Sequence, residues 1–134
     1  MSTAELLKQK NVRPSLQRIR ILDYLLERRN HPTVNTIYDD LLPQIPTLSR
    51  TTVYNTLETL CDSGLVITLD VGDGSVHYDA DTSPHAHFMC EKCGQIYDIF
   101  MKPEELKSVP AGFSIRSVQF YAFGLCAKCK RNSL

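Results

Sequence analysis

Two cysteine pairs constrain this chain of 134 residues more than any other feature. Cys90 and Cys93 form the first Cys-x-x-Cys pair, and Cys126 and Cys129 form the second, with 32 residues between the pairs. Four thiolates with this spacing are typical of a tetrahedral structural zinc site that closes a long loop. A redox-active dithiol is disfavoured, because neither pair lies in a βαβ context. We therefore predict that one Zn²⁺ ion holds the C-terminal part together.

The remaining sequence indicates a reducing compartment. The N-terminus lacks the basic flank and apolar core of a secretory signal, and no stretch approaches the ~20 apolar residues of a membrane span. Paired cysteines without a signal favour metal thiolates in the cytoplasm over disulfides. The fifth cysteine, Cys61, falls on the apolar face of a predicted helix, where we expect a buried structural thiol.

Up to residue 79, the pattern predicts four helices and a hairpin. Residues suited to cap the helix N-termini are Ser2 or Thr3, Ser15, Thr33 and Ser49. The sequence Asn30-His31-Pro32 separates the second helix from the third, Pro43 ends the third, and Gly64 follows the fourth. Residues 65–71 and 75–79 are predicted strands joined by residues 72–74. This order of elements predicts a winged helix-turn-helix domain over residues 1–79.

The fourth predicted helix carries side chains suited to reading DNA. If Val53, Leu57 and Leu60 face inward, the outward residues include Arg50, Thr51, Tyr54 and Asn55. The first twenty residues hold five basic residues against one acidic residue, and we expect Lys10 and Arg18 among them to contact phosphates. An ordinary amphipathic surface helix is the alternative, but the adjacent hairpin and the basic N-terminal segment favour double-stranded DNA.

Residues 80–134 read as a smaller α/β domain. Residues 86–89, 95–100 and 114–123 are predicted strands, and residues 103–108 are a predicted short helix. The first cysteine pair lies between two of these strands, and the second pair follows the third strand. The expected fold class for the whole chain is therefore α+β.

A second metal site is indicated beside the first cysteine pair. Two imidazoles that are two positions apart on a strand, as in the sequence His-x-His, face the same side. Mixed imidazole and carboxylate ligands suit Fe²⁺, Mn²⁺ or Zn²⁺. His77, in the predicted hairpin, is not expected to be a ligand. The candidate ligands are His85, His87, Asp98, Asp79, Asp81 and His31.

Several motifs resemble the ferric uptake regulator family of bacterial metal-responsive repressors. They are residues 13–18 (RPSLQR), the break at 31–33 (HPT), residues 52–55 (TVYN) and residues 85–94 (HAHFMCEKCG). The resemblance covers nearly the whole chain. It implies an N-terminal winged helix, a C-terminal α/β dimerisation domain over residues 80–134, and DNA binding as a homodimer at an inverted repeat.

Within that family, the chain is most similar to the peroxide-sensing repressors. The resemblance implies a regulatory Fe²⁺ or Mn²⁺ site whose ligands are His31, Asp79, His85, His87 and Asp98. It also implies that bound Fe²⁺ reacts with hydrogen peroxide and that His31 or His85 becomes oxidised. Iron-uptake members generally carry Glu where this chain has Asp98. Iron or manganese homeostasis is the alternative function.

Two alternatives come from other classes of protein. A metal-dependent hydrolase would need an open coordination position and a separate general base, and no Glu or His is obviously placed as that base. A zinc-ribbon interaction module without DNA binding would leave the predicted reading helix and hairpin unexplained. We therefore expect a DNA-binding repressor and no enzyme.

Overall fold

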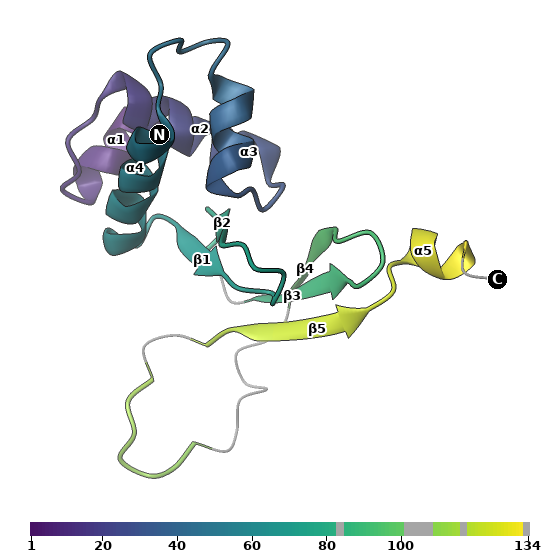
Figure 1. The fold of residues 1–134 in the computed structure, drawn as a ribbon. Helices are drawn as coiled ribbons and strands as arrows, with labels where there is room; N and C mark the ends of the chain where they lie inside the picture. Colours follow the sequence, from purple (N-terminus) through teal and green to yellow (C-terminus); the bar gives the residue numbers. More distant parts are fainter. Residues whose placement is uncertain (83–84, 101–108, 116–117, 133–134) are drawn as a thin grey trace. The chain divides into compact units, whose positions relative to one another are not determined.

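A computed structural model of the chain describes residues 1–82, 85–100, 109–115 and 118–132. It divides into two compact units, Met1–Thr82 and Ser83–Leu134. The first contains four helices and a two-stranded sheet, and the second contains a three-stranded sheet and a short helix (Figure 1). The fold class is α+β, as the sequence predicts.

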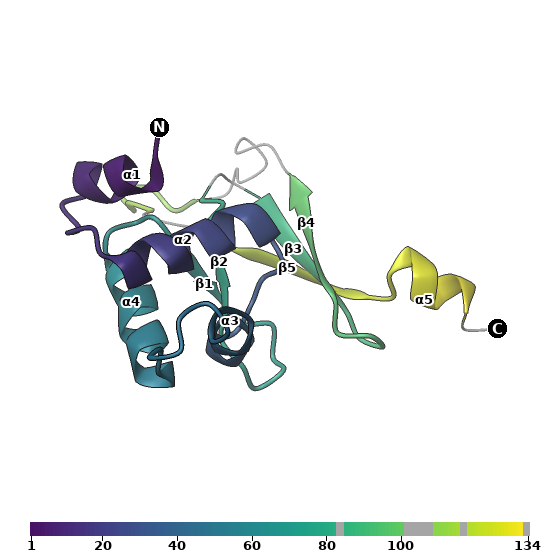
Figure 2. The same cartoon turned by 90° about the horizontal axis from the view of Figure 1, so that it is seen from above.

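The four helices of the first unit begin at the predicted capping residues. They are α1 (Thr3–Gln9), α2 (Leu16–Arg28), α3 (Val34–Leu41) and α4 (Arg50–Asp62). Each N-cap side chain accepts a hydrogen bond from the backbone N–H three residues later, and in α1 Glu5 completes a capping box with Ser2. Figure 2 shows α3 almost along its axis while α2 runs across the view, so these two helices cross steeply.

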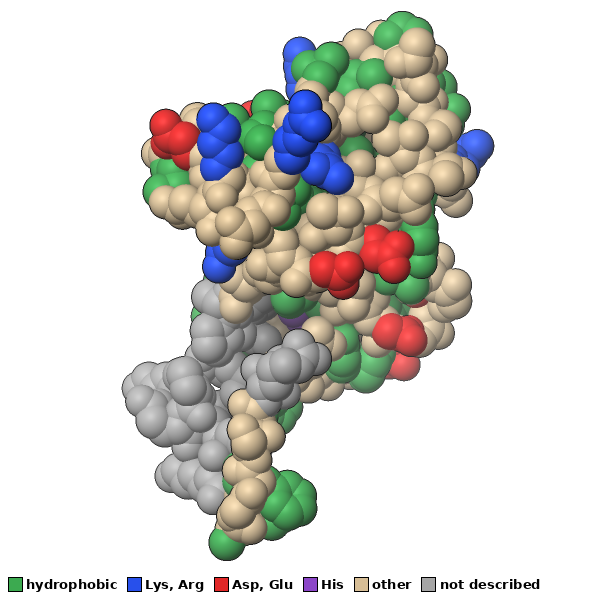
Figure 3. All heavy atoms as spheres, turned by 90° about the vertical axis from the view of Figure 1, so that its left-hand side faces the viewer, with side chains coloured by type: hydrophobic (Ala, Val, Ile, Leu, Met, Phe, Trp, Pro, Cys, Tyr) green, Lys and Arg blue, Asp and Glu red, His purple; other side chains and the backbone are tan. Residues whose placement is uncertain are grey.

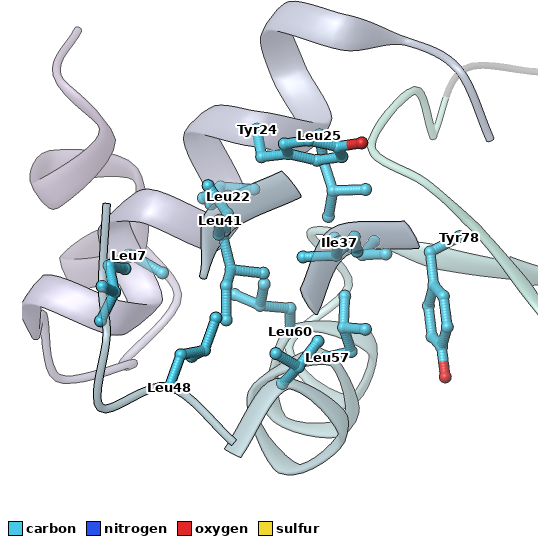
Figure 4. Packing of buried hydrophobic residues seen from close by; sticks show 14 of the residues in the cluster. Leu7, Leu22, Tyr24, Leu25, Ile37, Leu41, Leu48, Leu57, Leu60 and Tyr78 are labelled. Carbon is cyan, nitrogen blue, oxygen red and sulfur yellow. The ribbon is translucent and has the colours of Figure 1, made fainter. Parts of the chain in front are cut away.

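The core of this unit forms where the apolar faces of the helices meet. Leu22, Ile37, Leu57 and Leu60 are almost completely buried there (Figure 4). Tyr78, from the hairpin, also belongs to this cluster, which ties the hairpin to the helices. Gly64 has φ +84°, and Leu65 N donates to Leu60 O at 3.1 Å, so α4 ends in the predicted place.

The hairpin strands are shorter than predicted. β1 (Ile67–Leu69) pairs with β2 (His77–Asp79) in an antiparallel sheet, and the residues between them form a long loop. The carboxylates of Asp70 and Asp73 accept hydrogen bonds from Gly72 N and Ser75 N, which stabilises two successive turns instead of further strand pairing. We call residues 70–76 the wing loop.

The second unit is a three-stranded sheet in the order β4-β3-β5. β3 (His85–Cys90) pairs antiparallel with β4 (Ile96–Phe100) and parallel with β5 (Phe120–Gly124). The strand predicted over 114–123 is wrong in its first part, because among the described residues the strand begins only at Phe120, where the register with Ala86 starts. The predicted helix at 103–108 lies outside the described residues.

A short helix that the sequence pattern did not predict follows β5. α5 (Ala127–Arg131) begins immediately after Cys126, whose sulfur accepts a hydrogen bond from Cys129 N and so caps the helix. The run of Ala, Lys and Arg in this segment favours a helix and was the available signal. The second cysteine pair therefore lies on the first turn of a helix.

Candidate metal centres and nucleic-acid interface

The four paired cysteines converge in the second unit. Their sulfur atoms all lie within 4.8 Å of one another, although the chain separates the pairs. The Cys93 and Cys126 sulfurs are 4.0 Å apart, which is far longer than a disulfide bond of about 2.05 Å. Four sulfurs each about 2.3 Å from a tetrahedral Zn²⁺ ion would lie roughly 3.8 Å apart. The cluster therefore has the dimensions of a structural zinc site.

Backbone amides prepare two of these thiols to bind a cation. Cys126 N donates to the Cys90 sulfur at 3.4 Å, and this hydrogen bond is the main reason that the pKa of Cys90 falls to about 6. Cys129 N likewise lowers the pKa of Cys126. In contrast, burial raises the pKa of Cys129 to about 12, with neighbouring thiols adding to the effect. A cation at the centre would offset the repulsion among four thiolates, so the donor set fits Zn²⁺.

Cys61 lies outside this cluster and is less buried than the sequence predicts. It is partly exposed at the edge of the helical core, in α4. Burial is the largest cause that raises its pKa, to about 11, so it remains a protonated thiol at neutral pH.

The first unit places one imidazole beside one carboxylate. His31 Nε2 lies 3.5 Å from Asp79 Oδ2, and both residues are buried. The other carboxylate oxygen of Asp79 accepts a hydrogen bond from Asp81 N at 2.9 Å, which turns Oδ2 toward His31. Two donors bound to one transition-metal ion lie roughly 3–3.5 Å apart, so this spacing suits a pair of metal ligands.

The structure distinguishes the two aspartates near the end of the hairpin. Asp81, also a candidate from the sequence, has its carboxylate 3.7 Å from the guanidinium of Arg29. Asp79 is the one beside His31. His31 itself has φ +51°, a left-handed conformation that costs about 1–2 kcal/mol for a residue other than glycine. Because strained backbone conformations cluster at functional sites, this conformation favours a functional role for His31.

The second unit holds a matching pair. His87 on β3 and Asp98 on β4 are directly opposed in the antiparallel register, and His87 Nε2 lies 3.5 Å from Asp98 Oδ1. His87 is 2% exposed, so its imidazole is withdrawn from bulk water. The backbone of His85 begins β3, but its side chain lies outside the described residues. Each unit thus contributes one buried imidazole with a carboxylate beside it.

The outward face of α4 carries most of the side chains predicted to read DNA. Thr51, Tyr54 and Asn55 are exposed, and Tyr54 has 52% of its surface accessible. Arg50 is exposed as well, but it also contacts α3: its Nε donates to Asn35 Oδ1 at 2.9 Å, and its guanidinium lies 4.4 Å from the ring centroid of Tyr38.

A polar cavity of about 510 Å³ lies where the segment before α2 meets α4. Its lining combines the cations of Arg13 and Arg18 with the Asn55 amide and several hydroxyl groups. Arg18 is oriented by a 2.8 Å hydrogen bond to Arg13 O. Figure 3 shows Lys and Arg side chains exposed on one face of this unit. Arg13 lines this cavity although it was not among the residues expected to contact DNA; its place in the basic N-terminal segment was the available signal.

Sequence comparison places these features in a known class, the metal-dependent transcriptional regulators. The model of the ferric uptake regulator family matches residues 9–122. The peroxide operon regulator of Bacillus subtilis is 38% identical over 131 residues, covering 95% of this chain and 90% of its own length. The peroxide-responsive repressor PerR of Staphylococcus epidermidis is 36% identical over 128 residues, covering 92% of this chain and 85% of its own. The chain belongs to the ferric uptake regulator family.

A solved structure agrees with this assignment. The peroxide stress regulator of Campylobacter jejuni superposes with a TM-score of 0.72 at 28% identity, covering 96% of this chain and all of that one. The family comprises transcriptional regulators, so the chain is not an enzyme and the hydrolase alternative is wrong. None of the described helices is long and apolar enough to cross a membrane.

Proposed function

We propose that this protein is a metal-dependent, DNA-binding repressor that senses hydrogen peroxide in the cytoplasm. The observation that carries the proposal is the pair of buried imidazole–carboxylate sets, His31 with Asp79 and His87 with Asp98, each with donor atoms 3.5 Å apart. Similarity to relatives named for their response to peroxide, over more than nine-tenths of this chain, supports the choice of signal.

The regulatory ion would be Fe²⁺ or Mn²⁺, bound by both pairs together with His85. Mixed nitrogen and oxygen ligands suit either ion, whereas the four sulfurs of the other cluster suit Zn²⁺. Because His31 and Asp79 belong to the first unit while His85, His87 and Asp98 belong to the second, a shared ion would restrict the units to a DNA-competent arrangement. A ~100-fold preference of the ion for that arrangement corresponds to ~2.7 kcal/mol.

Oxidation would remove this restriction. Bound Fe²⁺ supplies the electron-transfer chemistry that activates hydrogen peroxide. In the net reaction, one oxygen atom of the peroxide enters a C–H bond of the His31 or His85 imidazole and the other leaves as water, so the ring loses two electrons. An oxidised imidazole is a poorer ligand, and loss of the ion would lower affinity for DNA.

DNA binding would use α4 of two copies at an inverted repeat. A helix of this length fits the major groove, and the cavity beside Asn55 offers two guanidinium groups to a phosphate. The second unit supplies exposed apolar side chains for a homodimer interface, among them Phe113, Phe120 and Phe123. Among the described residues, β5 is an edge strand of the sheet, and edge strands can pair with another chain.

We expect Asn55→Ala to weaken binding to the cognate inverted repeat and to relax base preference. Loss of one base contact typically costs ~1–3 kcal/mol, and the exposed amide of Asn55 has no part in the helical core. Fluorescence anisotropy with the cognate site and with single-base variants measures both effects, with Mn²⁺ bound to the protein throughout.

Lys10→Ala is the matched comparison, because Lys10 is exposed at the end of α1 and is expected to contact a phosphate. Lys10→Ala should weaken binding to all DNA sequences alike and reduce the salt dependence of that binding. If Asn55→Ala left both affinity and base preference unchanged, α4 would not read the DNA through this residue.

A further inference from the structure

His77 connects the wing loop to the backbone of His31. Its Nδ1 lies 2.8 Å from His31 O, and its Nε2 lies 2.7 Å from Asp73 Oδ2. A carbonyl oxygen only accepts hydrogen bonds, so the Nδ1–H group donates to His31 O, and Nε2 can donate to the Asp73 carboxylate at the same time only in the imidazolium form. The imidazole is 13% exposed and thus largely shielded from water. Through its two ring nitrogens, His77 on β2 therefore links the break between α2 and α3 to the wing loop.

The backbone at His31 needs support of this kind. Its left-handed conformation, φ +51°, is uncommon outside glycine, and Pro32 further restricts the residue before it. The next residue of β2 adds a second bond, because Tyr78 N donates to Pro32 O at 2.9 Å. Two successive residues of β2 thus hold two successive carbonyl groups of the break between α2 and α3.

Asp73 anchors the other side of the imidazole. Its carboxylate also accepts a hydrogen bond from Ser75 N at 3.1 Å, which fixes it within a turn of the wing loop. The hydrogen bond from His77 is the main reason that the pKa of Asp73 lies below its usual range, so the acceptor remains ionised near neutral pH. Charge-assisted hydrogen bonds of this kind are about twice as strong as neutral ones.

We propose that His77 is a positioning residue that holds the His31 backbone, and with it the imidazole, in the orientation for binding the regulatory ion. This inference rests on the proposed function, in which His31 is a ligand. Through Asp73, the wing loop then shares in the metal affinity of the protein. Partners that orient metal ligands typically change metal affinity 10- to 100-fold when they are removed.

The test compares His77→Leu with His77→Asn. We expect His77→Leu to weaken Mn²⁺ binding 10- to 100-fold, measured by competition with a fluorescent chelator. In the metal-free protein it should also speed amide hydrogen exchange at His31 and Thr33. Asn carries an N–H donor near the position of Nδ1, so His77→Asn should restore most of both properties. Zinc content should stay unchanged in both variants.

Asp73→Ala provides a second variant in case His77→Leu does not fold. Asp70→Ala is its matched control, because Asp70 makes the corresponding turn hydrogen bond to Gly72 N in the same wing loop. Asp73→Ala should weaken Mn²⁺ binding, while Asp70→Ala should bind Mn²⁺ with the affinity of the wild-type protein. Equal Mn²⁺ affinities for these two variants would overturn the positioning role.

His31→Ala separates a failure of this inference from a failure of the proposed function. If His31→Ala weakens Mn²⁺ binding and folded His77→Leu does not, His31 is a ligand and the positioning role of His77 is refuted. If His31→Ala itself binds Mn²⁺ like wild type, the assignment of His31 as a ligand fails, and the effect of His77 on metal affinity fails with it.

Discussion

Cys93→Ser protein is expected to lose its zinc and to fail to form a dimer. Cys93 is exposed, so the substitution removes a ligand without opening a cavity in a core. Binding of structural Zn²⁺ contributes about 10–16 kcal/mol to the folding of small zinc domains, which is comparable to the whole stability of a typical protein. The second unit, whose buried cluster centres on these cysteines, should therefore unfold.

Elemental analysis, circular dichroism and analytical ultracentrifugation measure the three effects. Cys61→Ser is the control: it also replaces a cysteine by serine, but its site is in α4, outside the cluster, so zinc and the dimer should be retained. A zinc-free Cys93→Ser dimer that melts like wild type would show that the four cysteines do not hold a structural metal.

Protein loaded with Fe²⁺ is expected to lose DNA binding on exposure to hydrogen peroxide, with one oxygen atom gained on His31 or His85. If the ion accounts for a ~100-fold preference for the DNA-competent arrangement, its loss should weaken DNA binding by about that factor. Mn²⁺-loaded protein should resist, because its redox chemistry with peroxide is less favourable with these ligands. Anisotropy and mass spectrometry of proteolytic peptides, before and after treatment, measure both changes.

Asp98→Glu tests whether the shorter carboxylate matters for oxidation. Asp98 lies opposite His87 across the β3–β4 ladder, and one added methylene would move the oxygens from their place 3.5 Å from the imidazole. We expect Asp98→Glu to keep metal-dependent DNA binding while its oxidation slows. The control is Asp81→Glu, which changes a carboxylate beside Arg29; this variant should be oxidised at the same rate as the wild-type protein.

The outcome also decides between the two functions within the family. If Fe²⁺-loaded wild-type protein remains unmodified and bound to DNA after peroxide, the protein is a regulator of iron or manganese homeostasis. In that case, DNA binding should follow the concentration of Fe²⁺ or Mn²⁺ alone.

Features that depend on short stretches of chain were predictable from the sequence. The caps at Ser15, Thr33 and Ser49 were correct because each satisfies a backbone N–H only three residues away. The four-cysteine cluster could be recognised because each Cys-x-x-Cys pair already brings two thiols together, leaving only the meeting of the pairs to the fold. The strand lengths were overestimated, because the aspartates of the wing loop favour turns over further pairing.

The sequence by itself determined the four-cysteine cluster, the helical first unit and the kinds of donor available to a regulatory metal. Only the tertiary structure decided which donors meet. It brought His31 Nε2 to within 3.5 Å of Asp79 Oδ2, held Arg50 against Tyr38, and gave His77 a bond to the backbone of His31, 46 residues away. Such contacts join residues that are distant in the chain, and their geometry follows from how the hairpin packs on the helical core, which local patterns do not encode.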